Sequence, residues 1–317
     1  MAMVNDSLHG LIIIDKPPGL TSHTVVKRVK TVLQVRKAGH TGTLDPFATG
    51  VLIVCINEGT KLAPFLMEEE KEYEALLHLG IETDTQDLTG SIIRKKEIKD
   101  ITILDIERTF KKFQGKVTQI PPMYSALKHE GVPLYLLARE GKEIERPKRV
   151  VEIRKLSILN IELPRVLFRV VCSKGTYIRA LANDIGKSLG CGACLEMLRR
   201  MRSGKFSLKN SLALETLEKK SPEEIKKRII PPAQALSSFP ALKIDEEISR
   251  KVLQGKIITP EELQKKGAII PDFKGKFRII DPQGRLMAVA ETISSTSIAK
   301  KGPKPVWRLL RVFNLRG

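Results

Sequence analysis

Strand-like and helix-like segments alternate through most of the chain, and this alternation limits the possible folds more than any other feature of the sequence. Apolar residues recur at helical spacing over 22–33, behind a capping Thr21 or Ser22, and a second helix is predicted near 178–190. Predicted strands are rich in β-branched residues; they lie at 10–15, 51–56, 72–81, 150–161 and 166–173. The mixture predicts an α/β or α+β fold.

A Pro- and Ser-rich stretch ending near Pro240 divides the chain into two predicted domains, residues 1–239 and 240–317. The second is the more basic for its length, with 16 Lys and Arg against 8 Asp and Glu. It begins with a helix signal at 245–255 and continues as two apolar runs around a Pro-Gln-Gly turn, which predict a hairpin. We therefore expect a small β-rich module after a larger first domain.

The charge balance points to a polyanionic partner. The chain has 55 Lys and Arg and 36 Asp and Glu, a formal net charge of +19, and such an excess favours nucleic acid because each neutralised phosphate releases counterions. The apolar run at 51–56 is far too short to span a bilayer, and the N-terminal segment lacks the pattern of a signal peptide. With only four cysteines, we expect a cytoplasmic protein without disulfides.

One loop combines flexible and chemically active residues. Residues 39–50, GHTGTLDPFATG, hold three glycines around a single carboxylate, Asp45, and Pro46 biases that residue away from the helical region. By itself an Asp-Pro pair is most often a turn or a helix cap. The loop lacks the Gly-Lys-Ser/Thr ending of a Walker motif, so nucleoside triphosphate hydrolysis is not supported.

Residues 38–52, AGHTGTLDPFATGVL, resemble the catalytic-aspartate signature of the TruB family of tRNA pseudouridine synthases. The likeness runs almost continuously from residue 10 to about 232. Five further segments follow the family's order: DKPPGLTSH, KEYEALLHLGIETDTQD, GKVTQIPPMYSALK, CSKGTYIRALANDIGKSLGCGA and LRRMRSGKF. The resemblance implies a pseudouridine synthase fold, with a mixed, largely antiparallel sheet flanked by helices, and the basic tail resembles the PUA module of many members.

The resemblance implies isomerisation of uridine-55 in the TΨC loop of tRNA, without metal or organic cofactor. The base flips out of the loop, and Asp45 acts as the nucleophile. Attack at C1′ and attack at C6 both remain open, as does the base that removes the proton. The family pattern pairs Asp45 with Arg179, whose charge is expected to lower the pKa of the carboxyl. It assigns stacking on the uracil, and a possible part in proton removal, to Tyr73, and places Tyr177 in the catalytic set.

Spacing constrains how these side chains are presented. Tyr177 and Arg179 would point to nearly opposite sides of a regular helix, but share a side in extended backbone. We therefore place them at a strand-to-helix junction, with the helix beginning near Ile178. In the segment KEYEALLHL, strand alternation puts Tyr73 on the face opposite Glu72 and Glu74.

Substrate RNA is expected to be bound by residues around this set. By resemblance, His40 stacks on RNA near the site and Leu198 lines the base pocket. We expect phosphate contacts from the basic runs at 146–149 and 198–205 and from the tail; the second run contains Arg199, Arg200, Arg202 and Lys205. The segment 124–150 resembles the RNA-clasping insertion of bacterial members. The expected partner is the T-arm of tRNA, bound by a monomer that needs no protein partner.

Two other functions are kept as alternatives. One is a dyskerin-like synthase that depends on a guide RNA and partner proteins, although its relatives lack the 124–150 segment. The other is an RNA-binding or tRNA-folding factor without essential catalysis. Cys191 and Cys194 have no second ligand pair at zinc-finger spacing, so Gly190 and Gly192 indicate a tight turn rather than a metal site.

Overall fold

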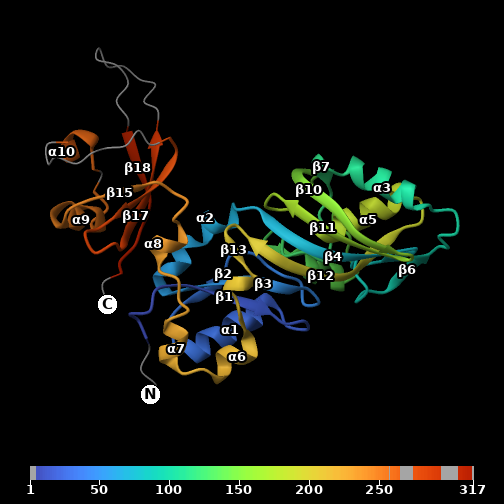
Figure 1. The fold of residues 1–317 in the computed structure, drawn as a ribbon, viewed down its shortest axis with the longest axis horizontal. Coiled ribbons are helices and arrows are strands. Elements are labelled where there is room, and N and C mark those ends of the chain that lie inside the picture. Colours follow the sequence, from blue (N-terminus) through green and yellow to red (C-terminus); the bar gives the residue numbers. More distant parts are fainter. Residues whose placement is uncertain (1–4, 257, 265–273, 294–305, 316–317) are drawn as a thin grey trace, which may run out of the picture.

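The computed structural model describes residues 5–256, 258–264, 274–293 and 306–315. Its larger part is a ten-stranded sheet whose main path runs β14-β1-β3-β12-β4-β11-β10-β7 (Figure 1). Within this sheet β1 pairs with β14, and β12 with β3, in parallel, and the other pairs are antiparallel. The prediction of a mixed, largely antiparallel sheet flanked by helices is confirmed.

The elements have the following bounds. The strands of the large sheet are β1 (Gly10–Lys16), β2 (Ala38–His40), β3 (Thr49–Ile56), β4 (Lys71–Leu79), β7 (Gly115–Gln119), β10 (Arg149–Glu162), β11 (Arg165–Cys172), β12 (Ala193–Ser203), β13 (Phe206–Ser207) and β14 (Leu212–Ala213). Two small hairpins are formed by β5 (Ile81–Thr83) with β6 (Ile92–Lys95), and by β8 (Lys128–His129) with β9 (Val132–Pro133). The helices of this part are α1 (Ser22–Leu33), η1 (Asn57–Leu62), α2 (Ala63–Met67), α3 (Ile103–Lys112), α4 (Leu134–Arg139), α5 (Ile178–Ser188), η2 (Leu208–Asn210), α6 (Leu214–Lys219), α7 (Pro222–Lys226) and α8 (Pro232–Ala235).

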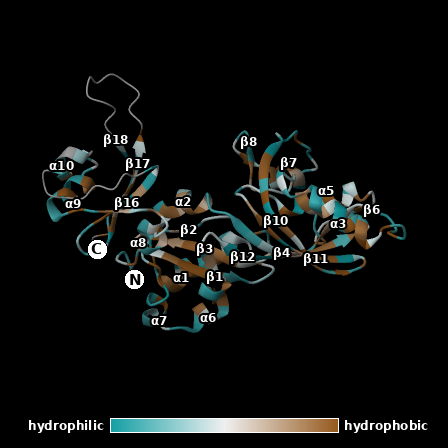
Figure 2. Cartoon of the chain, turned by 45° about the horizontal axis from the view of Figure 1, so that its top comes forward, coloured by the Kyte–Doolittle hydropathy of each residue, from teal (hydrophilic) through white to brown (hydrophobic). Residues whose placement is uncertain are grey.

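The burial of the strands follows their sequence patterns. β1 and β3 contain unbroken apolar runs, 11–14 and 51–56, because both of their faces are covered. On one face they pack against α1 and α6, and on the other against α2 and α8. β4 instead alternates between buried and partly exposed residues, since only one of its faces packs against α5 and α3. Figure 2 shows the hydrophobic residues of β1 and β3 in brown, near α1.

The last part of the chain forms a second sheet, in the order β15-β16-β17-β18. Its elements are β15 (Ala241–Lys243), α9 (Glu246–Leu253), α10 (Pro260–Gln264), β16 (Lys276–Ile280), β17 (Leu286–Ile293) and β18 (Val306–Val312). β16 and β17 are antiparallel, so the predicted hairpin is confirmed, as is the helix after Asp245. Part of the basic tail lies outside the described residues.

The two sheets share a hydrophobic cluster. Leu11 and Phe65 of the first part lie in one cluster with Leu286, Val289 and Phe313 of the second. The C-terminal sheet is therefore packed onto the large one through apolar side chains. No helix among the described residues is long and apolar enough to cross a membrane.

Candidate active site

A cavity of about 670 Å³ lies beside the loop that carries Asp45. It is walled by that loop, by β4, β12 and the start of α5, and by the start of β10. The side chain of Asp45 is 32% exposed, so a ligand in the cavity can reach it. Six predicted site residues line this cavity: Asp45, Tyr73, Tyr177, Arg179, Leu198 and Arg200.

Asp45 and Arg179 form a two-pronged ion pair. Nε of Arg179 donates to Oδ2 of Asp45 at 2.9 Å, and Nη2 donates to Oδ1 at 3.1 Å. The guanidinium is only 4% exposed, so its direction is set by the protein. A bidentate pair of this kind holds both carboxylate oxygens in one plane.

Two further N–H donors of Arg179 bind backbone carbonyls. Nη1 donates to the carbonyl of Thr85 at 2.8 Å, and Nη2 to that of Tyr124 at 2.7 Å. A second carboxylate, Asp87, lies 3.9 Å from Nη1 and is itself buried. Thr89 donates to Asp87 from its backbone N–H and its hydroxyl. Asp87 therefore adds negative charge behind the guanidinium and helps to fix it.

Desolvation raises the pKa of Asp45 above its usual value, and attraction to Arg179 and hydrogen bonding from it oppose that rise. Arg179 lowers the pKa of Asp45, as predicted, but burial outweighs this effect and the net shift is upward. The sequence indicated the cation correctly, but it did not show how far surrounding protein would displace water from the carboxyl.

Hydrogen bonds from Lys16 of β1 and Ser22 of α1 hold the Asp45 loop in place. The Lys16 side chain is fully buried, and its Nζ donates to the carbonyls of Pro46 and Ala48 at 3.1 and 2.7 Å. Its burial lowers the pKa of Lys16 to about 8. The hydroxyl of Ser22 accepts from the Leu44 N–H and donates to the Leu44 carbonyl, at 2.8 and 3.0 Å.

Arg200 of β12 also holds the Asp45 loop in place, by hydrogen bonds. Its Nε donates to the Val51 carbonyl at 2.6 Å and Nη2 to the Gly42 carbonyl at 3.1 Å. Gly50 makes this approach possible, since it has φ of 101° and a Cβ there would lie 2.2 Å from the Arg200 carbonyl oxygen. Arg200 is 3% exposed. The predicted phosphate contact from Arg200 does not fit this burial, and its contacts make it a positioning residue.

The junction at Tyr177 has the predicted form. Tyr177 is extended, with φ of −99° and ψ of 111°, and α5 begins at Ile178. Gln119 of β7, which is 1% exposed, holds this junction in place. Its side chain accepts from the Tyr177 N–H at 3.2 Å and donates to the Tyr177 carbonyl at 3.3 Å. Arg179 then points to Asp45 while the Tyr177 side chain lines the cavity.

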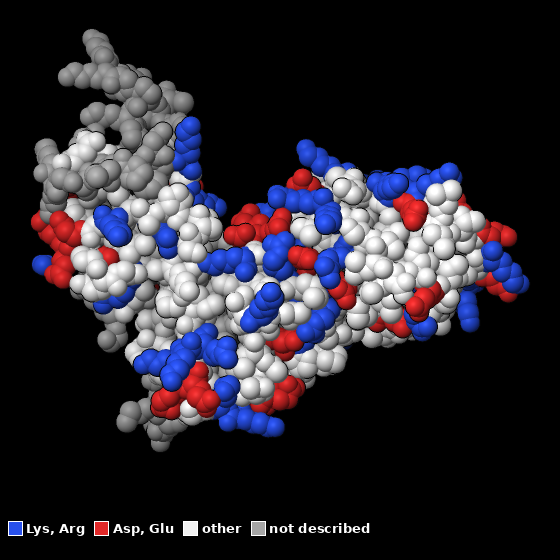
Figure 3. Space-filling view, in the orientation of Figure 1, with Lys and Arg blue, Asp and Glu red and all other residues white. Residues whose placement is uncertain are grey.

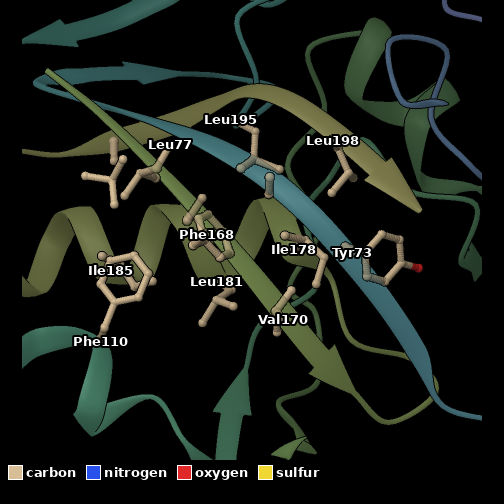
Figure 4. Close-up of a cluster of buried hydrophobic side chains, with 14 of the residues drawn as sticks. Tyr73, Leu77, Phe110, Phe168, Val170, Ile178, Leu181, Ile185, Leu195 and Leu198 are labelled. Atoms are coloured by element: carbon tan, nitrogen blue, oxygen red, sulfur yellow. The ribbon is translucent and has the colours of Figure 1, made fainter. Parts of the chain in front are cut away.

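Tyr73 lies at the end of the hydrophobic cluster that packs β4 against α5. Lys71, Tyr73, Ala75 and Leu77 are buried and alternate with less buried residues, so the predicted face is confirmed. Figure 4 shows the phenolic oxygen of Tyr73 pointing away from the cluster, with Leu198 on the neighbouring strand. Burial raises the pKa of Tyr73, so the free phenol stays neutral even well above pH 7, and a neutral ring is suited to stacking.

His40 ends β2, just before the Asp45 loop. Its Nδ1 accepts from the Gly42 N–H at 3.3 Å, and burial lowers the pKa of the imidazole. A neutral ring suits the predicted stacking on RNA. His40 is not among the described residues that line the cavity.

The other three predicted phosphate contacts on and after β12 are bound within the protein. Arg199 donates to Asp15 at 2.6 Å, and Arg202 donates to Glu72 and Glu70 at 3.0 and 2.7 Å. Lys205 donates to the Gln234 carbonyl and the Ser237 hydroxyl, both at 2.5 Å. Figure 3 shows basic and acidic side chains interspersed over this face rather than one basic patch.

Sequence reasoning missed several residues that support the site. Their sequence signal was weak, because a buried Lys or Gln is identified only by the surrounding structure. These residues are Lys16, Ser22, Asp87 and Gln119. All four lie in segments that resemble the family: Lys16 and Ser22 in DKPPGLTSH, Asp87 in KEYEALLHLGIETDTQD and Gln119 in GKVTQIPPMYSALK.

Comparison with known proteins identifies the family of the chain. Residues 30–178 match the model of the TruB family pseudouridylate synthase N-terminal domain, and residues 179–237 match the tRNA pseudouridylate synthase B C-terminal domain. The chain is 42% identical to tRNA pseudouridine synthase B of Geobacter sulfurreducens over 97% of this chain and 100% of that protein. It is equally similar to the synthase of Syntrophus aciditrophicus, over 98% of this chain and 100% of that protein.

Solved structures share the whole fold. A chain of a Cbf5-Nop10-Gar1 complex is 30% identical, with a TM-score of 0.73 over 98% of this chain and 86% of that chain. A chain of an archaeal box H/ACA sRNP Nop10-Cbf5 complex is 27% identical, with a TM-score of 0.71 over 98% and 87%. Family models, relatives and fold agree, and the chain belongs to the TruB family of tRNA pseudouridine synthases.

Proposed function

We propose that the chain isomerises uridine-55 in the T-loop of tRNA to pseudouridine, with Asp45 as the nucleophile. The observation that carries this proposal is the accessible Asp45 carboxylate, held by a buried bidentate Arg179 at the wall of a cavity. The reaction breaks the N1–C1′ bond and forms a C5–C1′ bond. C5 loses a proton and N1 gains one, so the uracil is rearranged without oxidation or hydrolysis.

The protein's part in this reaction is to present groups rather than to supply a cofactor. Arg179 and the loop contacts hold the carboxylate in one direction, which lowers the cost of reaching a reactive geometry. The target base must leave the T-loop, at a cost of a few kcal/mol for unstacking. A ring stacked on Tyr73 and packed against Leu198 would recover part of that cost.

Three finer assignments belong to the same proposal. The catalytic domain is residues 1–239, and residues 240–317 form a PUA-like RNA-binding domain, which the separate four-stranded sheet supports. The segment 124–150 clasps RNA, and its position is supported by Ser125, Ala126 and Leu127, which line the cavity. The working form is a monomer bound to the T-arm.

Tritium release tests the nucleophile. The wild-type chain should release tritium from a tRNA transcript that carries C5-tritiated uridine, without metal or guide RNA. Asp45→Asn should abolish release while leaving the Kd for tRNA nearly unchanged, because the carboxylate acts on the reacting nucleotide. Asp184→Asn is a matched control, since Asp184 on α5 is partly buried but lies outside this cavity. Full activity in Asp45→Asn would contradict the proposal.

The same assay separates the alternatives. Turnover of a bare transcript by the purified chain would exclude dependence on a guide RNA. A role in tRNA folding is tested by comparing tRNA refolding with the wild type and with Asp45→Asn. Equal refolding with loss of tritium release would show that the two activities are separate.

A further inference from the structure

Most cations that line the cavity have acceptors inside the protein. Arg179 binds Asp45, and Arg200 binds loop carbonyls. Lys71 donates to the carbonyls of Met67 and Glu69, and Lys174 donates to Glu68. In the part of the chain that the structure describes, Lys148 and Arg149 are the two cavity-lining cations whose side chains have no such acceptor.

Arg149 differs from Lys148 because its direction is fixed. The guanidinium carbon of Arg149 lies 5.7 Å from the centroid of the Tyr177 ring. Arg149 pairs with Gln119 across β10 and β7, and Gln119 in turn holds the backbone of Tyr177. The register of two strands therefore places this cation beside the tyrosine.

Stacking on a ring leaves the N–H donors of a guanidinium unused. Nη1 of Arg149 lies 3.6 Å from the position that a Cβ at Gly175 would take, so a glycine there leaves room beside the guanidinium. The side chain is partly exposed, and its neighbours Lys148 and Val150 are exposed. Arg149 is therefore a preordered donor group at the rim of the cavity.

A nucleotide whose base enters the cavity must leave its own phosphates at the rim. We propose that Arg149, stacked on Tyr177, binds a backbone phosphate next to the flipped nucleotide. This inference rests on the proposed function, and it assigns to the start of β10 the phosphate contact that the buried Arg200 cannot make. The ligand is the phosphodiester of RNA, recognised by a planar fork of N–H donors.

The test measures Kd for a T-arm RNA at several salt concentrations, together with kcat and KM. Arg149→Met should weaken binding several-fold and raise KM, with kcat nearly unchanged. One lost phosphate contact should reduce the slope of log Kd against log salt by about 0.7 to 0.9. Arg149→Lys should keep the slope and recover part of the affinity, because it keeps the charge but loses the fork.

Arg154→Met is the matched control. Arg154 lies on the same strand and is 58% exposed, but it pairs with Glu70 and Glu152 at 3.2 and 3.6 Å. Its loss should leave Kd and salt slope unchanged. If Arg149→Met behaves like this control while the wild type remains active, the inference is wrong and the proposed function stands.

A third result would also overturn the inference. If Arg149→Met lowers kcat without changing the salt slope, then Arg149 only positions Tyr177. Failure of the proposed function would look different, because the wild-type chain itself would then release no tritium from tRNA.

Discussion

Two basic segments lie beside the cavity, and they use their charge in opposite ways. On and after β12, Arg199, Arg200, Arg202 and Lys205 all donate to acceptors within the protein. At the start of β10, Arg149 keeps its donors free and stacks on Tyr177. Both segments look alike as runs of Lys and Arg in the sequence.

The difference follows from the neighbours of each strand. β12 lies between β3 and β4 within the sheet, where Glu72 and the loop carbonyls are within reach. The first residue of β10 lies at the cavity, opposite the neutral Gln119. A basic run therefore indicates nucleic-acid binding only where the fold leaves its donors without acceptors.

Arg200→Met tests whether the buried cation of β12 has a structural role, and it should affect the protein more than the other changes. Loss of Arg200 leaves the buried Val51 carbonyl and the partly buried Gly42 carbonyl without their donor, at about 1–3 kcal/mol for a buried acceptor. The Asp45 loop should shift, and misplacement of about 1 Å can reduce the rate by about 100-fold. We expect a lower Tm and a much lower kcat, measured by thermal melting and tritium release. The salt slope of tRNA binding should not change, and a smaller slope would show that Arg200 binds phosphate.

A pH profile distinguishes the contribution of the buried Asp45 from that of Arg149 at the rim of the cavity. Burial raises the pKa of Asp45 above 3.8, so the carboxylate becomes protonated at a higher pH than an ordinary Asp. As pH falls through that pKa, kcat/KM should fall by about tenfold per pH unit. Arg149→Met should show the same acid limb, because Arg149 contacts Tyr177 rather than Asp45. Circular dichroism at each pH controls for unfolding, and a limb at or below pH 3.8 would refute the raised pKa.

Arg202→Met should change stability and binding less than the other substitutions. Its two ion pairs are partly exposed, so they contribute about 1 kcal/mol at most. Glu70 and Glu72 also lie near Arg154 and Arg169, which remain to neutralise them. We expect Tm to fall by at most about 2 °C, by thermal melting, with tRNA affinity unchanged. A loss of affinity would place Arg202 with the rim segment instead.

The sequence predicted the parts of the site that depend on local geometry. Thr21 caps α1, α5 begins at Ile178, and Tyr73 lies on the buried face of β4. Each follows from a rule that acts over a few residues: a side-chain cap, a change of backbone periodicity, and strand alternation. A tight turn was also predicted at Gly190 and Gly192, and both residues have the positive φ that such turns use.

What could not be predicted depends on distant partners. Arg200 and Arg149 are both ordinary cations in the sequence, and only strand order decides which one is buried. Gln119 lies 58 residues from the Tyr177 that it holds. The direction of the Asp45 pKa shift likewise depends on how much protein surrounds the carboxyl, which no spacing rule gives.

The shared cluster of Leu11, Phe65 and Phe313 has a consequence for how the protein is made. Leu11 is synthesised long before Phe313. One side of the sheet that carries the Asp45 loop therefore stays incompletely covered until the residues around Phe313 have been made. A nascent chain that stalls before Phe313 would present that apolar side to chaperones and to other unfinished chains.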